Sequence, residues 1–394
     1  MRIAGSDGAL VIAEDTVIDL SQAVTSNWDA NNSANVGKGI YDSNKWAVVF
    51  KYSSVTIQGG ATVTFKNHAS RAPVVWLVQG DVTVNGMVSL DGAGPAIAPY
   101  LPEPGPGAFR GGSGPYAQET AAGFGPGGGA PATDHNYSSG AGGSYGSLGQ
   151  FGSSTYGNPS LIPLVGGSGG GGSGFTGGKA GGAGGGAMLI ACAGQLSVPG
   201  TIRANGGNAQ AVAFAASGSG GGIRLVAETL DGAGVVEAIG GGFNYQSLAG
   251  GNGRVRIERV TNASSLQITP DPSVVTLAAG TTPQIWLPTN GPTVRVVSIE
   301  GNAAPSDPRA EFGAIGADIV LPQVTNVTVV VETTVAEDAS TVTVRATPRS
   351  NGNFSERVAS LTEVVSEDPK VIRWTANVPV SDGYAAIQVK VVRP

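Results

Sequence analysis

The sequence has little cysteine and little histidine: one Cys, Cys192, and two His. One cysteine permits no internal disulfide, and a structural zinc site needs several thiolate or imidazole ligands. We therefore expect no metal and no cofactor, and a chain stabilised by packing and backbone hydrogen bonds. Charge is also sparse, at 13% of residues with a net charge of −6 and no basic cluster. Because a nucleic-acid groove needs clustered Lys and Arg, nucleic acid is not an expected partner.

Long apolar runs and helical periodicity are missing as well. No apolar run approaches the ~18 residues of a membrane helix, so we expect no membrane insertion. The start, Met-Arg-Ile-Ala-Gly-Ser-Asp-Gly, has no apolar segment after its charge, so a chain that begins naturally at Met1 is not expected to use the usual export signal. Valine, threonine and isoleucine alternate with small or polar residues, which predicts strands and almost no helix.

Glycine is the residue in excess, at 64 of 394 positions. It is unevenly spread, since 33 of the 64 lie between Gly92 and Gly186. Hydrophobic residues make up 41% of the chain, which is enough for a core. These figures indicate a folded protein that contains one glycine-rich region, rather than a disordered chain.

An internal repeat links two distant segments. Gly80–Gly92 and Gly194–Gly206 share glycine and apolar residues at matching positions, with an offset of 114 throughout. Looser copies precede the first segment by 27 residues and follow the second by 34. The strand at 187–191 recurs at 223–227 and again at 255–258. A unit of this size cannot bury its apolar row alone, and stacking copies solves that problem.

The repeat predicts a right-handed parallel β-helix, that is, a solenoid; an irregular β-sandwich is the alternative that the matching offset disfavours. The glycines between the short strand steps are expected to bend the chain with φ > 0 at a coil corner. The inward positions would be Val82, Val84, Val88, Leu90, Leu196, Val198, Ile202 and Ala204.

The composition divides the chain into parts. We expect an N-terminal cap or edge strands over 1–45, the β-helix over 46–262 and a glycine-rich insertion over 93–186 that interrupts it. The insertion is expected either to form mobile loops or to pack as left-handed extended segments with three residues per turn. Residues 263–272 read as a linker, and 273–394 as an immunoglobulin-like β-sandwich. Its expected strands are Ser273–Leu277, Gln284–Leu287, Thr293–Ile299, Asp318–Leu321, Val327–Glu332, Thr341–Ala346, Val371–Ala376 and Ala385–Val392.

This organisation resembles the glycine-rich parallel β-helix proteins of phage fibres or spikes and of bacterial surfaces. Gly80–Gly92, Gly194–Gly207 and Gly220–Gly241 carry the resemblance, which covers about residues 46–262. It is architectural, so it says little about a ligand or a reaction. In such families the β-helix is usually a rigid external part, often trimeric in phage, that meets polysaccharide or protein surfaces.

The insertion is the candidate contact surface because it holds nine of the 24 aromatic residues with few charges. Aromatic rings among glycine and serine suit glycan stacking or protein contact. The alternative is that the rings form the insertion's own small core. The candidate binding residues are Tyr100, Phe109, Tyr116, Phe124, Tyr137, Tyr145 and Tyr156.

A catalytic alternative is a polysaccharide lyase or hydrolase, because parallel β-helices host such enzymes and these need clustered carboxylates. The equivalent repeat positions carry Asp91, Asn205 and Ile239, and Asp81 is expected to stack on Gln195. With no second carboxylate one coil away, Asp81 and Asp91 read better as turn residues that bond nearby backbone. We therefore predict no catalytic residues.

The expected function is that of a non-enzymatic structural or adhesive protein outside the cell. A phage virion component is favoured over a secreted bacterial adhesin or fibre subunit, because virion proteins assemble in the cytoplasm and need no signal peptide. The expected partners are other virion or surface proteins and host-surface glycans. Since uncapped solenoid ends are sticky, we also expect a homo-oligomer, with a trimer as one option.

Overall fold

The computed structural model describes residues 4–30, 36–94, 102–114, 120–132, 139–173, 179–209, 214–242, 248–308 and 317–394. Over these residues the chain is all-β, with strands β1 to β26, one short 3₁₀ turn at Leu20–Gln22 and no α-helix. The expectation of an all-β chain with almost no helix is confirmed.

Two sheets built mainly of parallel strands form the first part, which we call the parallel stack (β1–β18). The larger sheet has twelve strands and the smaller has six. The larger contains β1 (Ala9–Ile12), β3 (Val24–Thr25), β4 (Ile40–Asp42), β5 (Ala47–Tyr52), β6 (Ser54–Ile57), β8 (Val74–Val78), β9 (Val82–Val84), β11 (Ala187–Cys192), β12 (Gln195–Ser197), β14 (Gly222–Asp231), β16 (Arg254–Asn262) and β18 (Ser273–Thr276). The smaller contains β2 (Thr16–Asp19), β7 (Thr62–Lys66), β10 (Met87–Ser89), β13 (Thr201–Arg203), β15 (Val235–Glu237) and β17 (Gln267–Thr269).

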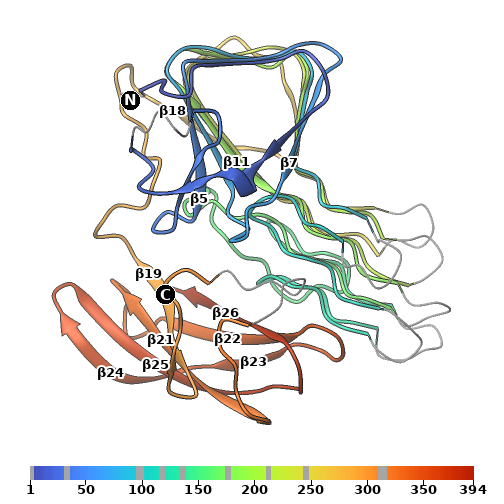
Figure 1. Cartoon of the computed structure of the whole chain (residues 1–394), viewed down its shortest axis with the longest axis vertical. Helices are drawn as coiled ribbons and strands as arrows, with labels where there is room; N and C mark the ends of the chain where they lie inside the picture. Colours follow the sequence, from blue (N-terminus) through green and yellow to red (C-terminus); the bar gives the residue numbers. More distant parts are fainter. Residues whose placement is uncertain are drawn as a thin grey trace.

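Successive passes of the chain add one strand to each of three rows. The pass β8–β9–β10 is followed by β11–β12–β13, and each strand pairs in parallel with its counterpart. Figure 1 shows these passes as coils with a three-sided outline, coloured from blue to yellow. Leu196 pairs with Val82 and Ile202 with Val88, so the 114-residue offset read from the sequence is the true register.

The interior of the stack is filled by one apolar cluster. All eight predicted inward residues, from Val82 to Ala204, belong to it and are at most 1% exposed. Valine and isoleucine alternate with smaller residues along short strands, so one row of side chains faces the interior while the other faces outward. Trp76 and Phe50 are among the largest side chains of this cluster and are fully buried.

Two weaker repeats differ in part from the register that the sequence suggests. The 27-residue offset is confirmed for Val55 with Val82 and for Ile57 with Val84. Val63 pairs with Val88, an offset of 25 instead of 27, because the turn before β7 is longer than the turn before β10. Met188 pairs with Ile223, an offset of 35 instead of the 36 implied by aligning 187–191 with 223–227. A slip of one residue exchanges the two faces of a strand, so the second difference changes which residues are core.

The corner glycines serve a purpose other than the one predicted. None of Gly86, Gly200 and Gly206 has a positive φ. A side chain there would instead collide with backbone oxygen atoms: a Cβ on Gly200 would lie 2.0 Å from the carbonyl oxygen of Gly86. Close approach between coils, not a left-handed bend, therefore requires glycine at these positions.

Antiparallel strands form the second part, two sheets that share one core. The five-stranded sheet holds β19 (Thr293–Ile299), β20 (Asn302–Ala303), β21 (Asn326–Thr334), β24 (Ser360–Glu367) and β25 (Lys370–Pro379). The three-stranded sheet holds β22 (Thr341–Pro348), β23 (Ser355–Val358) and β26 (Ala385–Val392). We call β19–β26 the C-terminal sheets; they are orange to red in Figure 1.

The start of this second part differs from the sequence prediction. β18 was expected to open it, but β18 pairs in parallel with β16, and β17, inside the expected linker, pairs with β15. Residues 284–287 and 318–321 form no strand. Residues 284–287 lie instead against the outer face of the stack, where Ile285 and Trp286 pack on an apolar cluster. The mostly exposed strand β24 and its neighbour β23 were missed because they lack a clear apolar alternation.

Candidate contact surface and cavities

Glycine-rich segments project from the coils and pack side by side, to the right of the stack in Figure 1. We call them the glycine bundle; within the described residues they are 105–114, 121–132, 140–152, 166–173, 179–186, 204–209, 214–221, 238–242 and 248–253. The sequence prediction limited this region to 93–186. Segments after β13 and β15 also belong to it, and the glycine pairs at 206–207, 220–221 and 250–251 are the signal that marks them.

Each bundle segment exchanges hydrogen bonds with several neighbours at every third residue. The N–H groups of Gly181, Gly184 and Ala187 donate to the carbonyls of residues 112, 109 and 106. Those of Gly182 and Gly185 donate to residues 216 and 219, and those of residues 183 and 186 to residues 93 and 90. A repeat of three with three different partners is the geometry of an extended helix with three residues per turn. For these residues the packed alternative of the sequence prediction is therefore the observed one.

Backbone contact leaves no room for side chains in the bundle. A Cβ on Gly182 would lie 2.0 Å from the carbonyl oxygen of Gly207, and one on Gly171 would lie 1.9 Å from that of Ala130. Backbone atoms cannot move aside as the end of a flexible side chain can. The glycines thus build a rigid element in which backbone polar groups are paired.

Three of the predicted contact residues are buried. Phe124, Tyr145 and Tyr156 are 4%, 0% and 8% exposed, and the two tyrosine rings pack together with Leu161. Their faces cannot stack on a glycan, which corrects the prediction for these residues in favour of the small-core alternative. Phe109 is half-buried. Tyr100, Tyr116 and Tyr137 lie outside the described residues.

The buried tyrosines are tied into the bundle by polar contacts. The hydroxyl of Tyr156 donates to the carbonyl of Gly166 at 2.6 Å and accepts from the hydroxyl of Ser168 at 3.0 Å. Arg254 donates to the carbonyl of Tyr156 at 3.0 Å. Burial raises the pKa of both Tyr145 and Tyr156, so both phenols stay neutral. The hydroxyl of Tyr145 has no hydrogen-bond partner among the described residues, so this residue acts through packing.

Phe151 is the exposed aromatic residue that the structure places on the bundle. Its side chain is 72% exposed, and Leu148 beside it in the chain is 56% exposed. Phe151 has φ = 59°, a left-handed conformation that costs energy for a residue with a Cβ. The backbone around it is fixed, since Gln150 donates to Ala249 and accepts from Gly142. Phe151 was not among the candidate binding residues predicted from the sequence.

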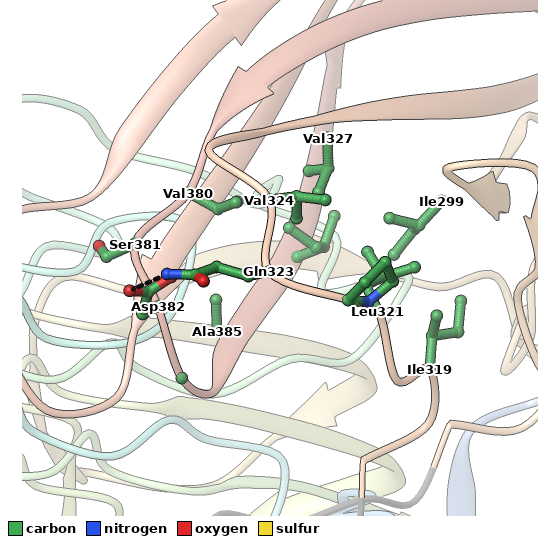
Figure 2. A pocket seen from close by; sticks show the side chains of 13 residues that line it. Ile299, Ile319, Leu321, Gln323, Val324, Val327, Val380, Ser381, Asp382 and Ala385 are labelled. Carbon is green, nitrogen blue, oxygen red and sulfur yellow. Dashed lines mark hydrogen bonds between the residues drawn. The ribbon is translucent and has the colours of Figure 1, made fainter.

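The C-terminal sheets contain a cavity of about 190 Å³. Figure 2 shows its aliphatic walls, which include Leu321, Val324 and Val327, and the polar pair at its rim. At the rim Gln323 donates to the carboxylate of Asp382 at 3.2 Å. The cavity has room for a small aliphatic group, and its single carboxylate is already engaged.

Aspartates at the coil corners bind the next coil. Asp81 accepts a hydrogen bond from the N–H of Gln195 at 2.7 Å, and Asp91 accepts from that of Asn205 at 2.8 Å, 114 residues away in both cases. Both aspartates therefore bond backbone, as the sequence favoured, but on the next coil and not within their own turn. Burial raises the pKa of Asp91 in spite of its ion pair with Arg203.

A second carboxylate lies near Asp91, which the sequence prediction missed. Asn205 donates its side-chain amide to Glu237 at 2.7 Å, so Asp91, Asn205 and Glu237 follow one another across three coils. Glu237 stands two positions before Ile239, the residue that the repeat aligns with Asp91. Since neighbouring strands are about 4.8 Å apart, the two coils that carry these carboxylates are about 10 Å apart.

Cys192 lies in the apolar cluster of the stack, 5% exposed. Burial raises the pKa of its thiol to about 12. Cys192 pairs with Val78 on β8. The register of β11 with β14 places Ala227 opposite Cys192, not Glu228 as the 36-residue alignment implied. Cys192 is a packing residue in this structure, since a nucleophilic cysteine needs a lowered pKa.

A scan against protein-family models, a search of curated proteins and a search of solved structures each found no match. Within the described residues, no helix has the length and apolar character needed to cross a membrane. In the same part of the chain, no three His, Cys, Asp or Glu residues cluster in a way that would hold a metal ion.

Proposed function

We propose that this chain is a structural and adhesive protein that acts outside the cell, as a component of a phage virion. In this proposal the parallel stack is a right-handed parallel β-helix and the C-terminal sheets are an immunoglobulin-like sandwich. The β-helix is the rigid support, the glycine bundle is a lateral contact element, and the sandwich attaches the chain to partner proteins. A secreted bacterial adhesin or fibre subunit is the alternative setting for the same three parts.

The observation that carries the proposal is the hydrogen-bonded glycine bundle, held between the other two parts. Its segments are continuous with the strands of the stack, and Ala122 and Gly125 bond to the C-terminal sheets through Gly352 and Arg345. A bundle fixed at both sides holds the exposed ring of Phe151 in place. Little conformational entropy of the protein is then lost when a partner binds. Preorganisation of this kind raises affinity without new contacts.

The location of the chain in a virion and the contact role of the glycine bundle can be tested separately. Mass spectrometry of purified particles should find the chain in stoichiometric amount, in several copies if it forms a homo-oligomer such as a trimer. A chain found only in the medium, processed from a longer precursor, would overturn the virion setting and leave the adhesin.

The contact role is tested by binding of the labelled protein to host cells. Phe151→Ala should weaken binding about tenfold, because aromatic anchors dominate contact surfaces. Val320→Ala, at a residue 81% exposed in the C-terminal part, is the matched control and should bind as the wild type does. Equal binding by both variants would remove Phe151 from the contact surface.

A second candidate function is polysaccharide cleavage, favoured by one observation, the pair Asp91 and Glu237, which Asn205 links across three coils. A raised pKa on one of two carboxylates is the arrangement of a general acid with its partner base. The coils that carry them are about 10 Å apart, and carboxyl groups that lean toward each other from there would fall within the range of about 6.5–9.5 Å for hydrolysis with inversion. Release of reducing ends from host polysaccharide that is lost in Asp91→Asn would establish this function, and no release by the wild type would exclude it for that polysaccharide.

A further inference from the structure

A second cavity, of about 210 Å³, lies where the three parts of the chain meet. Its floor is the outer face of the stack, including Ala47, Val75 and Leu189. The loop at 161–164, which connects two segments of the glycine bundle, forms one wall. The segment 285–289, which leads to β19, forms the opposite wall with Ile285 and Trp286. Most of the lining is therefore apolar and drawn from segments far apart in sequence.

Positive charge is in excess around this cavity. Arg224, 1% exposed, pairs with Glu258 at 2.8 Å, but Glu258 also pairs with Arg256 at 3.1 Å. One carboxylate thus serves two guanidinium groups. Lys45 also lines the cavity, and its ammonium has no hydrogen bond or ion pair with any residue that the structure describes.

The remaining acid nearby does not cancel this excess. Asp42, beside Lys45 in the chain, uses one oxygen for the N–H groups of Asn44 and Lys45 and the other for that of Trp28. Counting Arg224, Arg256 and Lys45 against Glu258 and Asp42 leaves one positive charge. A charge in excess beside apolar walls favours an anion that brings its own apolar body.

Two hydrogen-bond donors in the lining lack good acceptors. The indole N–H of Trp286 is buried and has no partner among the described residues. One guanidinium nitrogen of Arg224 reaches only the carbonyl of Ile285, at 3.5 Å, a length at which a hydrogen bond is weak. Buried donors without good acceptors cost free energy, so this part of the lining is poorly satisfied by the protein itself.

We propose that this cavity binds a small aromatic carboxylate, with the ring between Leu189 and the Trp286 segment and the carboxylate toward Lys45. The size fits, because a cavity of about 150 Å³ accommodates benzene, and the extra volume accommodates the carboxylate. Such a ligand contacts the stack, the bundle and the segment leading to the C-terminal sheets, so it holds the three parts together.

The test uses the full chain and two probes of equal shape, benzoate and neutral benzamide, with binding measured by calorimetry. Benzoate should bind the wild type about tenfold more tightly, since that ratio corresponds to one modest ionic contact. Lys45→Met keeps the length of the side chain and should abolish the preference. Lys38→Met, at an exposed lysine elsewhere, should keep it.

Ala47→Val narrows the floor of the cavity and should weaken the binding of both benzoate and benzamide. This variant separates the effect of cavity size from the effect of charge. The proposal is overturned if neither probe binds the wild type, if benzamide binds as tightly as benzoate, or if Lys45→Met retains the preference. A folded Lys45→Met variant, shown by an unchanged unfolding curve, makes the last result decisive.

Discussion

At Gly182 the missing side chain lets two backbones touch. Its N–H donates to the carbonyl of Ala216 at 2.9 Å, and a Cβ would lie 2.0 Å from the carbonyl oxygen of Gly207. The same requirement for space, not for a left-handed φ, explains Gly86 and Gly200 at the coil corners. In this chain most of the excess glycine is therefore a packing residue, because it allows hydrogen bonds between extended segments that side chains would separate.

Gly182→Ala should destabilise the protein by about 1–3 kcal/mol, the usual cost of overpacking a rigid site. The reason is that the new methyl group meets backbone atoms on neighbouring segments. Gly59→Ala is the control, because a Cβ there meets nothing within 4 Å and φ is not positive; it should change the free energy of unfolding by less than about 0.5 kcal/mol. Urea unfolding of both variants measures the difference. Equal stability of Gly182→Ala and Gly59→Ala would mean that the backbone of the bundle moves to make room for the methyl group.

At the level of elements, the sequence predicted the strands that repeat and failed where packing decides. Leu196 and Ile202 were placed correctly because glycine and apolar residues recur together at one offset. The pairing of Met188 with Ile223 was missed by one residue, since both faces of β11 are buried and the apolar pattern does not separate them. Burial of Tyr145 was also undetermined, because a ring among glycines reads the same whether it covers the backbone or faces solvent.

The element-level prediction concerns the bond from Asp91 to the next coil. Because burial raises the pKa of Asp91 in the folded state, protonation favours the native protein over the unfolded chain. The stability from this group is fully present below the unfolded pKa and is lost as the pH rises through the folded value. Asp91→Asn is neutral throughout, so the free energy of unfolding of the wild type should fall relative to the variant between strongly acid and neutral pH. Urea unfolding across that range measures the difference, and a constant difference would contradict the prediction.

At the scale of the whole molecule, buried arginines connect the parts. Arg224 extends from β14 to the carbonyl of Gln284, at 2.6 Å, in the segment that leads to the C-terminal sheets. Arg345 on β22 donates to the carbonyls of Gly125 and Gly128 in the bundle, at 3.1 and 3.3 Å. The planar guanidinium offers several donors in fixed directions, which suits a junction where backbone carbonyls of another part need partners.

Arg345→Met should weaken the junction between the bundle and the C-terminal sheets. It removes both bonds to the bundle and the 2.8 Å ion pair with Glu356, and leaves acceptors without donors at a site where the arginine is 3% exposed. We expect a loss of about 2–4 kcal/mol, because unsatisfied buried acceptors cost about 1–3 kcal/mol each and Glu356 is partly solvated. Scanning calorimetry should show the C-terminal sheets unfolding in a separate transition at lower temperature.

Arg357→Met, at an exposed residue of the neighbouring strand β23, is the control and should leave the wild-type calorimetric profile unchanged. An Arg345→Met profile that shifts without splitting would mean that the remaining contacts, such as Ala122 to Gly352, suffice to keep the parts in one cooperative unit.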